Sequence, residues 1–188
     1  MRDLETNLKK FAIIASLVKE INGRWTLGRT AIQKYLYLLQ EVYGFDIGYE
    51  FKFYTYGPFS SEILANIDIL AQIGAVKVDS VVYSSGAHGY KVTPDNLIDT
   101  IIENEPNYKD NDKLKDIISK FISSSAEDLE LDATIVWVDR DLSSKAESSF
   151  KQIEDLVKQL KPKFDDSKIK EHIEKLRGYG FLKIAVGA

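Results

Sequence analysis

The 188-residue chain is predicted to adopt an α+β fold that is mostly helical. Along most of the sequence, apolar residues recur three or four positions apart, which is the spacing of a helix with one buried face. Alternating residues rich in aromatic and β-branched types are confined to 49–56 and 76–92, so the predicted sheet is small and antiparallel. Because 44% of the residues are hydrophobic, the chain can bury a core, and the class of disordered proteins is excluded.

The first half of the chain is predicted to form three helices and two β regions. Amphipathic helices are expected over residues 5–21, 30–43 and 61–73, with a short strand at 24–27. The aromatic run 49–56 is a predicted strand that ends at Gly57-Pro58, because proline has no amide hydrogen for the ladder. Residues 76–92 predict a hairpin around a Ser/Gly loop. The order helix, short strand, helix, helix, hairpin is that of a winged helix, to which the aromatic strand is an addition.

The second half is predicted to be helical. Helices are expected over residues 94–104, 112–123, 126–140, 144–160 and 167–177, with a short strand at 181–186. Pro162 breaks the chain between the last two helices. Since no flexible linker separates the halves, we expect a winged-helix-like domain at 1–94 and a helical domain at 95–188 that packs on it.

Charge and composition limit the partners and the compartment. The first 94 residues carry a net charge of +1 and the last 94 carry −5, so no strongly basic half predicts nucleic-acid binding. The chain has no cysteine, which fits a reducing cytosol. No apolar run approaches the roughly 20 residues of a membrane span, and the N-terminus lacks the apolar core of a signal peptide. We therefore expect a cytoplasmic protein without a membrane partner.

One stretch resembles a known family. Residues 28–38 (GRTAIQKYLYL) and 53–60 (FYTYGPFS) resemble the YwgA-like group of uncharacterised prokaryotic proteins. LELDAT at 129–134, Lys161-Pro162 and LRGYGF at 176–181 are similar to the second half of that group. Residues 10–75 are more loosely similar to the Panacea domain of SocA-type antitoxins. The resemblance implies a non-enzymatic regulatory or neutralising protein.

A partner surface is predicted around the Tyr-Gly-Pro-Phe corner. Proline fixes the turn at Pro58, and a rigid corner can present aromatic side chains to a protein. On the preceding helix, Arg29 and Gln33 lie four apart and off the apolar stripe, where they could meet a carboxylate or phosphate. The alternatives are a corner that packs on the core and an ordinary solvated helix face. The candidate partner-binding residues are Arg29, Gln33, Lys34, Tyr37, Tyr54, Tyr56, Gly57, Pro58 and Phe59.

Nucleic-acid binding is the second hypothesis. In a winged helix the third helix enters the major groove, where Arg, Lys, Asn and Gln read bases. The outward positions here are expected to be Glu62, Asn66, Asp68 and Gln72, and the two carboxylates would repel phosphates. The last helix carries more basic residues, although a salt-bridged solvent face is the alternative. The candidate nucleic-acid contacts are Asn66, Gln72, His88, Lys91, Lys168, Lys170, Lys175 and Arg177.

No catalytic, metal or cofactor motif is recognised. His88 and His172 are far apart in sequence, and there is no cysteine to complete a metal site. Six acidic residues are expected on the solvated side of one long helix, namely Glu127, Asp128, Glu130, Asp132, Asp139 and Asp141. The sequence therefore favours a non-enzymatic, antitoxin-like regulator that binds a protein partner, with a DNA-binding regulator as the alternative. A homodimer is compatible with either.

Overall fold

The computed structural model describes residues 2–82, 86, 88–105, 112–143 and 149–184. The predicted α+β class is confirmed, because this part of the chain forms eight helices and two small antiparallel sheets. The first half contains α1 (Arg2–Ile21), α2 (Arg29–Tyr43), β1 (Lys52–Tyr54), β2 (Gly57–Phe59), α3 (Ser61–Gln72), β3 (Val76–Val82) and β4 (His88–Pro94). The second half contains α4 (Ile98–Glu103), α5 (Asp112–Phe121), α6 (Ala126–Ser143), α7 (Phe150–Leu160) and α8 (Asp166–Gly178).

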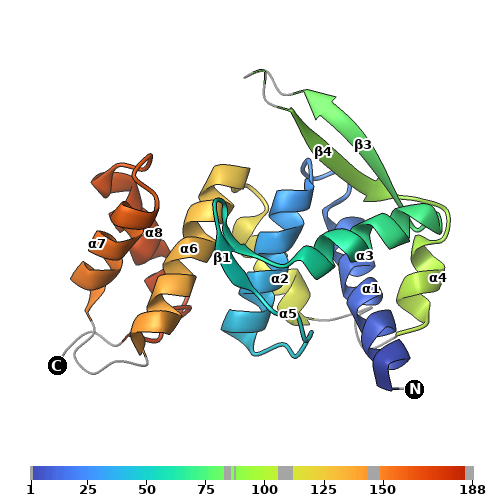
Figure 1. Cartoon of the computed structure of the whole chain (residues 1–188), viewed down its shortest axis with the longest axis horizontal. Coiled ribbons are helices and arrows are strands. Elements are labelled where there is room, and N and C mark those ends of the chain that lie inside the picture. The colour runs from blue at the N-terminus through green and yellow to red at the C-terminus, as the bar shows by residue number, and fades with distance from the viewer. Residues whose placement is uncertain (1, 83–85, 87, 106–111, 144–148, 185–188) are drawn as a thin grey trace.

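The helix α2 is the centre of the fold. Nine consecutive residues, Ala31 to Leu39, are buried, as is typical of a helix that is covered on every side. α1 and α3 lie on one side of it, α5 and α6 on the other, and α7 and α8 form the far end beyond α6 (Figure 1). One cluster of buried apolar residues runs through both halves of the chain, from Ile14 of α1 to Ile135 of α6.

The aromatic segment forms a hairpin rather than one strand. β1 pairs antiparallel with β2, with Phe53 opposite Pro58 and Tyr54 opposite Gly57. The expectation that Gly57-Pro58 ends the strand region is therefore wrong. Proline is tolerated in this short edge strand, because only alternate residues of an antiparallel pair donate to the ladder.

The second hairpin, β3–β4, projects from the helical body (Figure 1). Its register is unbroken from Val76 opposite Pro94 to Val82 opposite His88, as predicted for 76–92 outside the loop. Residues 24–27 form no strand, but the Leu27 carbonyl oxygen accepts a hydrogen bond of 2.8 Å from the Val92 N–H of β4. Phe181 to Ile184 form no strand either, and 185–186 lie outside the described residues.

Candidate functional site

The tip of the β1–β2 hairpin exposes two large aromatic side chains. Tyr54 is 66% exposed and Tyr56 is 60% exposed, and they lie on either side of Thr55 in the turn. The half-buried ring of Phe59 lies with its centre 5.8 Å from that of Tyr54. We refer to these three side chains, Tyr54, Tyr56 and Phe59, as the aromatic tip.

Side chains from α2 hold the hairpin from below. The Gln33 side chain is buried and makes two bonds to the Ser60 backbone, donating to the carbonyl at 2.8 Å and accepting from the N–H at 2.9 Å. Lys34 is 1% exposed, and its Nζ donates to the Pro58 carbonyl at 2.6 Å. These bonds satisfy backbone groups that the short hairpin would otherwise leave unpaired.

The second half of the chain holds the hairpin from the side. The Lys161 side chain donates to the Thr55 carbonyl in the turn and forms an ion pair of 2.7 Å with Glu130. Both ionic side chains are almost fully buried. Gly57 has φ +83°, and a Cβ at this position would lie 3.0 Å from Thr134 Oγ1 of α6. Glycine is therefore required both by the backbone conformation and by the close approach to α6.

Holding the hairpin places a charged amine in the core. Burial lowers the pKa of Lys34 to about 8, and nearby Lys161 acts in the same direction, while Glu130 opposes the shift. A reduction from 10.5 to about 8 corresponds to about 3 kcal/mol of destabilisation at neutral pH. In return for this destabilisation, the Lys34 amine fixes the position of the Pro58 carbonyl.

Several predicted contact residues on α2 and the turn are not on the surface. Gln33, Lys34 and Tyr37 of α2 are buried, so the expectation of an exposed face on this helix is wrong for them, and Gly57 and Pro58 in β2 are buried as well. The single apolar stripe suggested that the opposite side of the helix faces water. In the fold, β2 and α6 cover that side.

Tyr37 and Arg29 of α2 also have partners within the chain. The ring of Tyr37 packs 6.0 Å from Trp137 of α6, measured between centroids, which explains its burial. Arg29 remains partly exposed, yet it donates to Asp68 at 2.5 Å and its guanidinium lies 4.6 Å from the centre of the Tyr90 ring. Its charge is therefore already neutralised by a carboxylate of α3.

The candidate nucleic-acid contacts are scattered. Asn66 is buried and donates to the Tyr49 hydroxyl at 3.0 Å, so the expectation that it points outward from α3 is wrong. Gln72, His88 and Lys91 are exposed. A hollow of about 390 Å³ lies beside Lys91, between β4 and the loop that follows α1. Its lining includes Arg24 and Lys91 and no acidic residue.

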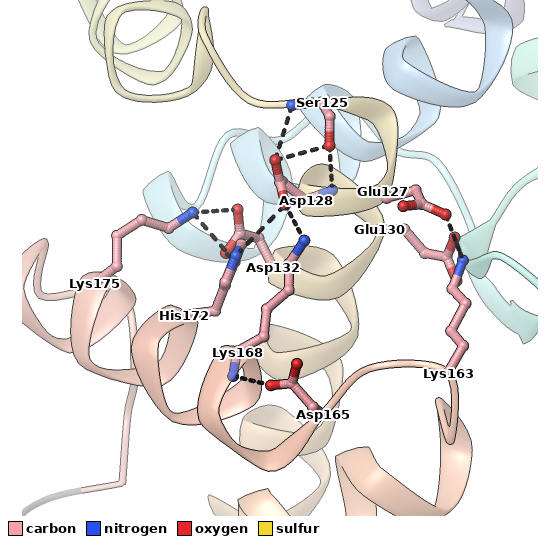
Figure 2. A network of polar contacts seen from close by, with 10 residues as sticks. All are labelled: Ser125, Glu127, Asp128, Glu130, Asp132, Lys163, Asp165, Lys168, His172 and Lys175. Atoms are coloured by element: carbon pink, nitrogen blue, oxygen red, sulfur yellow. Dashed lines mark hydrogen bonds and ion pairs between the residues drawn. The ribbon is translucent and has the colours of Figure 1, made fainter. Parts of the chain in front are cut away.

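A dense polar network joins α6 to α8 (Figure 2). Asp132 is fully buried and lies 2.7 Å from His172 Nδ1 and 2.6 Å from Lys175 Nζ. Asp128 accepts from Lys168 at 2.8 Å. Two of the four basic candidates on the last helix thus point at α6, and their charges are matched within the chain.

The other two basic candidates of α8, Lys170 and Arg177, are exposed. Arg177 pairs with Glu174 at 3.3 Å, as the salt-bridged alternative predicted. A nucleic-acid surface on this helix would therefore have far less free charge than the sequence suggested.

The acidic residues of α6 do not lie on one solvated side. Glu130, Asp132 and Asp139 are buried, so that expectation is wrong for these three. Asp139 accepts from the backbone N–H groups of Lys183 and Ile184, which fixes the chain after α8. Because these partners lie far away in sequence, the pattern of α6 alone could not reveal them.

Within the described residues no group of three or more His, Cys, Asp or Glu side chains could hold a metal ion.

Comparisons of the chain with models of protein families, with curated proteins and with solved structures found no match. Of the helices that the structure describes, none has the length and apolarity needed to cross a membrane.

Proposed function

We propose that the chain is a non-enzymatic regulatory protein that acts by binding a protein partner through the aromatic tip. The observation that carries the proposal is the contrast between the tip and its support. Tyr54 and Tyr56 are more than half exposed, while the backbone between and after them is bonded by buried side chains from α2 and by Lys161.

Such a tip has the properties of a binding hot spot. Tyrosine is enriched among the residues that dominate protein interfaces, because it buries a large area with few rotatable bonds. A surface already fixed in its bound shape loses less entropy on binding.

The kind of regulation is suggested by the sequence. The loose similarity of residues 10–75 to the Panacea domain of antitoxins supports an antitoxin-like role, in which the tip contacts a toxin or another effector protein.

Affinity capture tests the proposal. The intact chain and a Tyr54→Ala/Tyr56→Ala variant are used as bait in a lysate of the source cells, and captured proteins are identified by mass spectrometry. Tyr90→Ala is the matched control, because it also removes an exposed tyrosine but lies on β4. We expect specific proteins with the intact chain and with the control, and their loss with the tip variant at unchanged thermal stability.

The same proteins captured by all three baits would refute the role of the tip. A large drop in melting temperature of the tip variant would instead show that the two rings stabilise the fold. Both rings are mostly exposed, so the expected change in stability is small.

DNA binding by a winged-helix-like unit is the second candidate. The element order of α1, α2, α3 and β3–β4, and the bond between Leu27 and Val92, support such a unit. The specific observation in favour is the hollow with Arg24 and Lys91 beside β4. Against it, Glu62 and Asp68 of α3 are engaged with Lys10 and Arg29, which leaves no excess of positive charge there.

Gel shifts decide between the candidates. A DNA-binding regulator retards genomic fragments at low salt, loses affinity steeply as salt rises, and loses it again in an Arg24→Gln/Lys91→Gln variant. If no fragment is retarded at low salt, the DNA candidate is refuted.

A further inference from the structure

The β3–β4 hairpin has a backbone edge that the described residues leave unpaired. β4 faces the loop after α1, where Val92 donates to Leu27, and β3 lies on the outer side of the projecting hairpin (Figure 1). Within the described part of the chain, the sheet contains these two strands alone. The outer edge of β3 therefore offers N–H and C=O groups to another strand.

The hydrogen-bond pattern shows which groups these are. In an antiparallel pair, residues that exchange two bonds alternate with residues whose N–H and C=O point away from the partner strand. Val92 donates to Leu27, away from β3, so its cross-strand neighbour Val78 also points outward. The Asp95 N–H donates to the Ala75 carbonyl, which shows independently that the odd-numbered residues of β3 direct their backbone groups towards β4. The outward-facing backbone groups of β3 are those of Val76, Val78, Ser80 and Val82.

The edge lacks the features that usually protect an exposed strand. Natural edge strands are kept apart by proline, by bulges or by a surplus of charge. The strand sequence VKVDSVV contains no proline, its register has no bulge, and its one lysine is balanced by one aspartate. Val82 is 65% exposed near the tip of the hairpin. A strand of this composition is expected to be covered in the working protein.

We propose that the outer edge of β3 pairs antiparallel with the same edge of a second copy, about a two-fold axis at Ser80. The product is a four-stranded sheet in the order β4, β3, β3, β4. A two-fold pairing needs one surface that is complementary to itself, and an unpaired antiparallel edge meets this condition. The interface is separate from the aromatic tip, so the dimer would present two tips to partners.

Charge and space argue against three neighbouring positions of the axis. An axis at Lys77 would place two lysines opposite each other, and an axis at Asp79 would place two aspartates opposite each other, which is destabilising. An axis at Val78 would bring the partner's Val82 opposite Gly74, where the chain has left the strand and α3 ends nearby. An axis at Ser80 avoids these conflicts and leaves the two helical bodies at opposite ends of the sheet.

This axis also covers exposed apolar surface. Val82 would face the partner's Val78 on the same side of the sheet, between two neighbouring strands. The central pair is Ser80 with the partner's Ser80, which exchanges two backbone hydrogen bonds. Each end of the pairing therefore buries a valine that the single chain leaves largely in water.

Sedimentation velocity over a wide range of protein concentration tests the proposal. We expect the intact chain to form a dimer that dissociates on dilution. Ser80→Pro removes an outward N–H and no bond of the β3–β4 ladder, so the dissociation constant should rise at least about tenfold through the loss of the two central hydrogen bonds. Ser80→Thr is the matched control, because it keeps the N–H, and it should dimerise like the intact chain. Circular dichroism is used to verify that the variants are folded.

A charge-reversal pair tests the axis itself. Ser80→Lys and Ser80→Glu each place like charges opposite each other across the axis and should be monomeric alone. Their mixture places opposite charges together and should restore a dimer, which no other axis position predicts. A chain that is monomeric at all concentrations overturns the proposal, as does a dimer that Ser80→Pro leaves unchanged or a mixture that stays monomeric.

Discussion

The buried amine of Lys34 makes a sharp prediction about pH. Its pKa is lowered to about 8 by burial, against 10.5 in the unfolded chain. The unfolded state therefore binds more protons between these two values, and stability rises with pH across that window. Below pH 8 the destabilisation is fully present, and it is relieved as the pH rises from 8 towards 10.5. Applied to these two values, the linkage relation gives a gain of about 1 kcal/mol between pH 7 and pH 9.

The variant Lys34→Met isolates this effect. It removes the titrating group and also the bond to the Pro58 carbonyl, whose loss costs about 1–3 kcal/mol at every pH. At pH 7 the two changes nearly cancel, so the stabilities of the variant and the natural chain should be similar. Between pH 7 and pH 9 the natural chain should gain about 1 kcal/mol of stability relative to the variant.

Urea unfolding at pH 7, 8 and 9 measures the difference. Groups that do not interact with Lys34 titrate alike in both proteins and therefore cancel in the comparison. Lys170→Met is the matched control, because it replaces a lysine that is exposed on α8 instead of one that is buried on α2. A difference for Lys34→Met that is constant from pH 7 to pH 9, or that changes in favour of the variant, would refute the argument.

Three further predictions concern stability. Gly57→Ala should cost about 2 kcal/mol or more, because φ +83° strains any other residue and the new Cβ meets Thr134; an unchanged melting temperature would contradict this. Asp132→Asn should cost about 1–3 kcal/mol in urea unfolding, because it removes a fully buried carboxylate that lies 2.6 Å from Lys175 Nζ and 2.7 Å from His172 Nδ1. Burial raises the pKa of Asp128, but hydrogen bonds from Lys168 and a serine outweigh this and lower it to about 2. The stabilisation by ionised Asp128 is therefore full above pH 4 and is lost as the pH falls through 2. In acid titrations, the difference in free energy of unfolding between the natural chain and Asp128→Asn should become smaller over that range.

The exposed aromatic tip was accessible to sequence reasoning. Alternation over 49–56 placed Glu50, Lys52, Tyr54 and Tyr56 on one face, and all four are exposed. What the pattern did not contain was the support of the tip. Lys161 contacts Thr55 from 106 residues away, and no local periodicity predicts such a contact.

The central helix shows the limit of periodicity most directly. The stripe that includes Ile32 and Leu36 predicted one buried face, and both residues are fully buried. Gln33 and Lys34 on the other side are buried as well, because β2 and α6 pack against them. A polar residue in an amphipathic helix pattern is exposed to solvent only when no other element of the fold packs against it.

The same limit applies to charge. The acidic residues of α6 were expected in water because ionic groups are seldom buried without partners. Asp132 has its partners in His172 and Lys175, which lie about forty positions later in the chain. Their separation in sequence concealed the network that attaches α8 to α6.

The sequence alone predicts the local features of this protein, namely the amphipathic helices, the β3–β4 hairpin and the outward alternation of Tyr54 and Tyr56. These follow from backbone periodicity, which depends only on near neighbours. Only the tertiary structure decided which polar and charged side chains are buried. Their burial depends on partners such as Glu130 for Lys161, and such pairs form only where the fold brings distant segments into contact and removes water from between them.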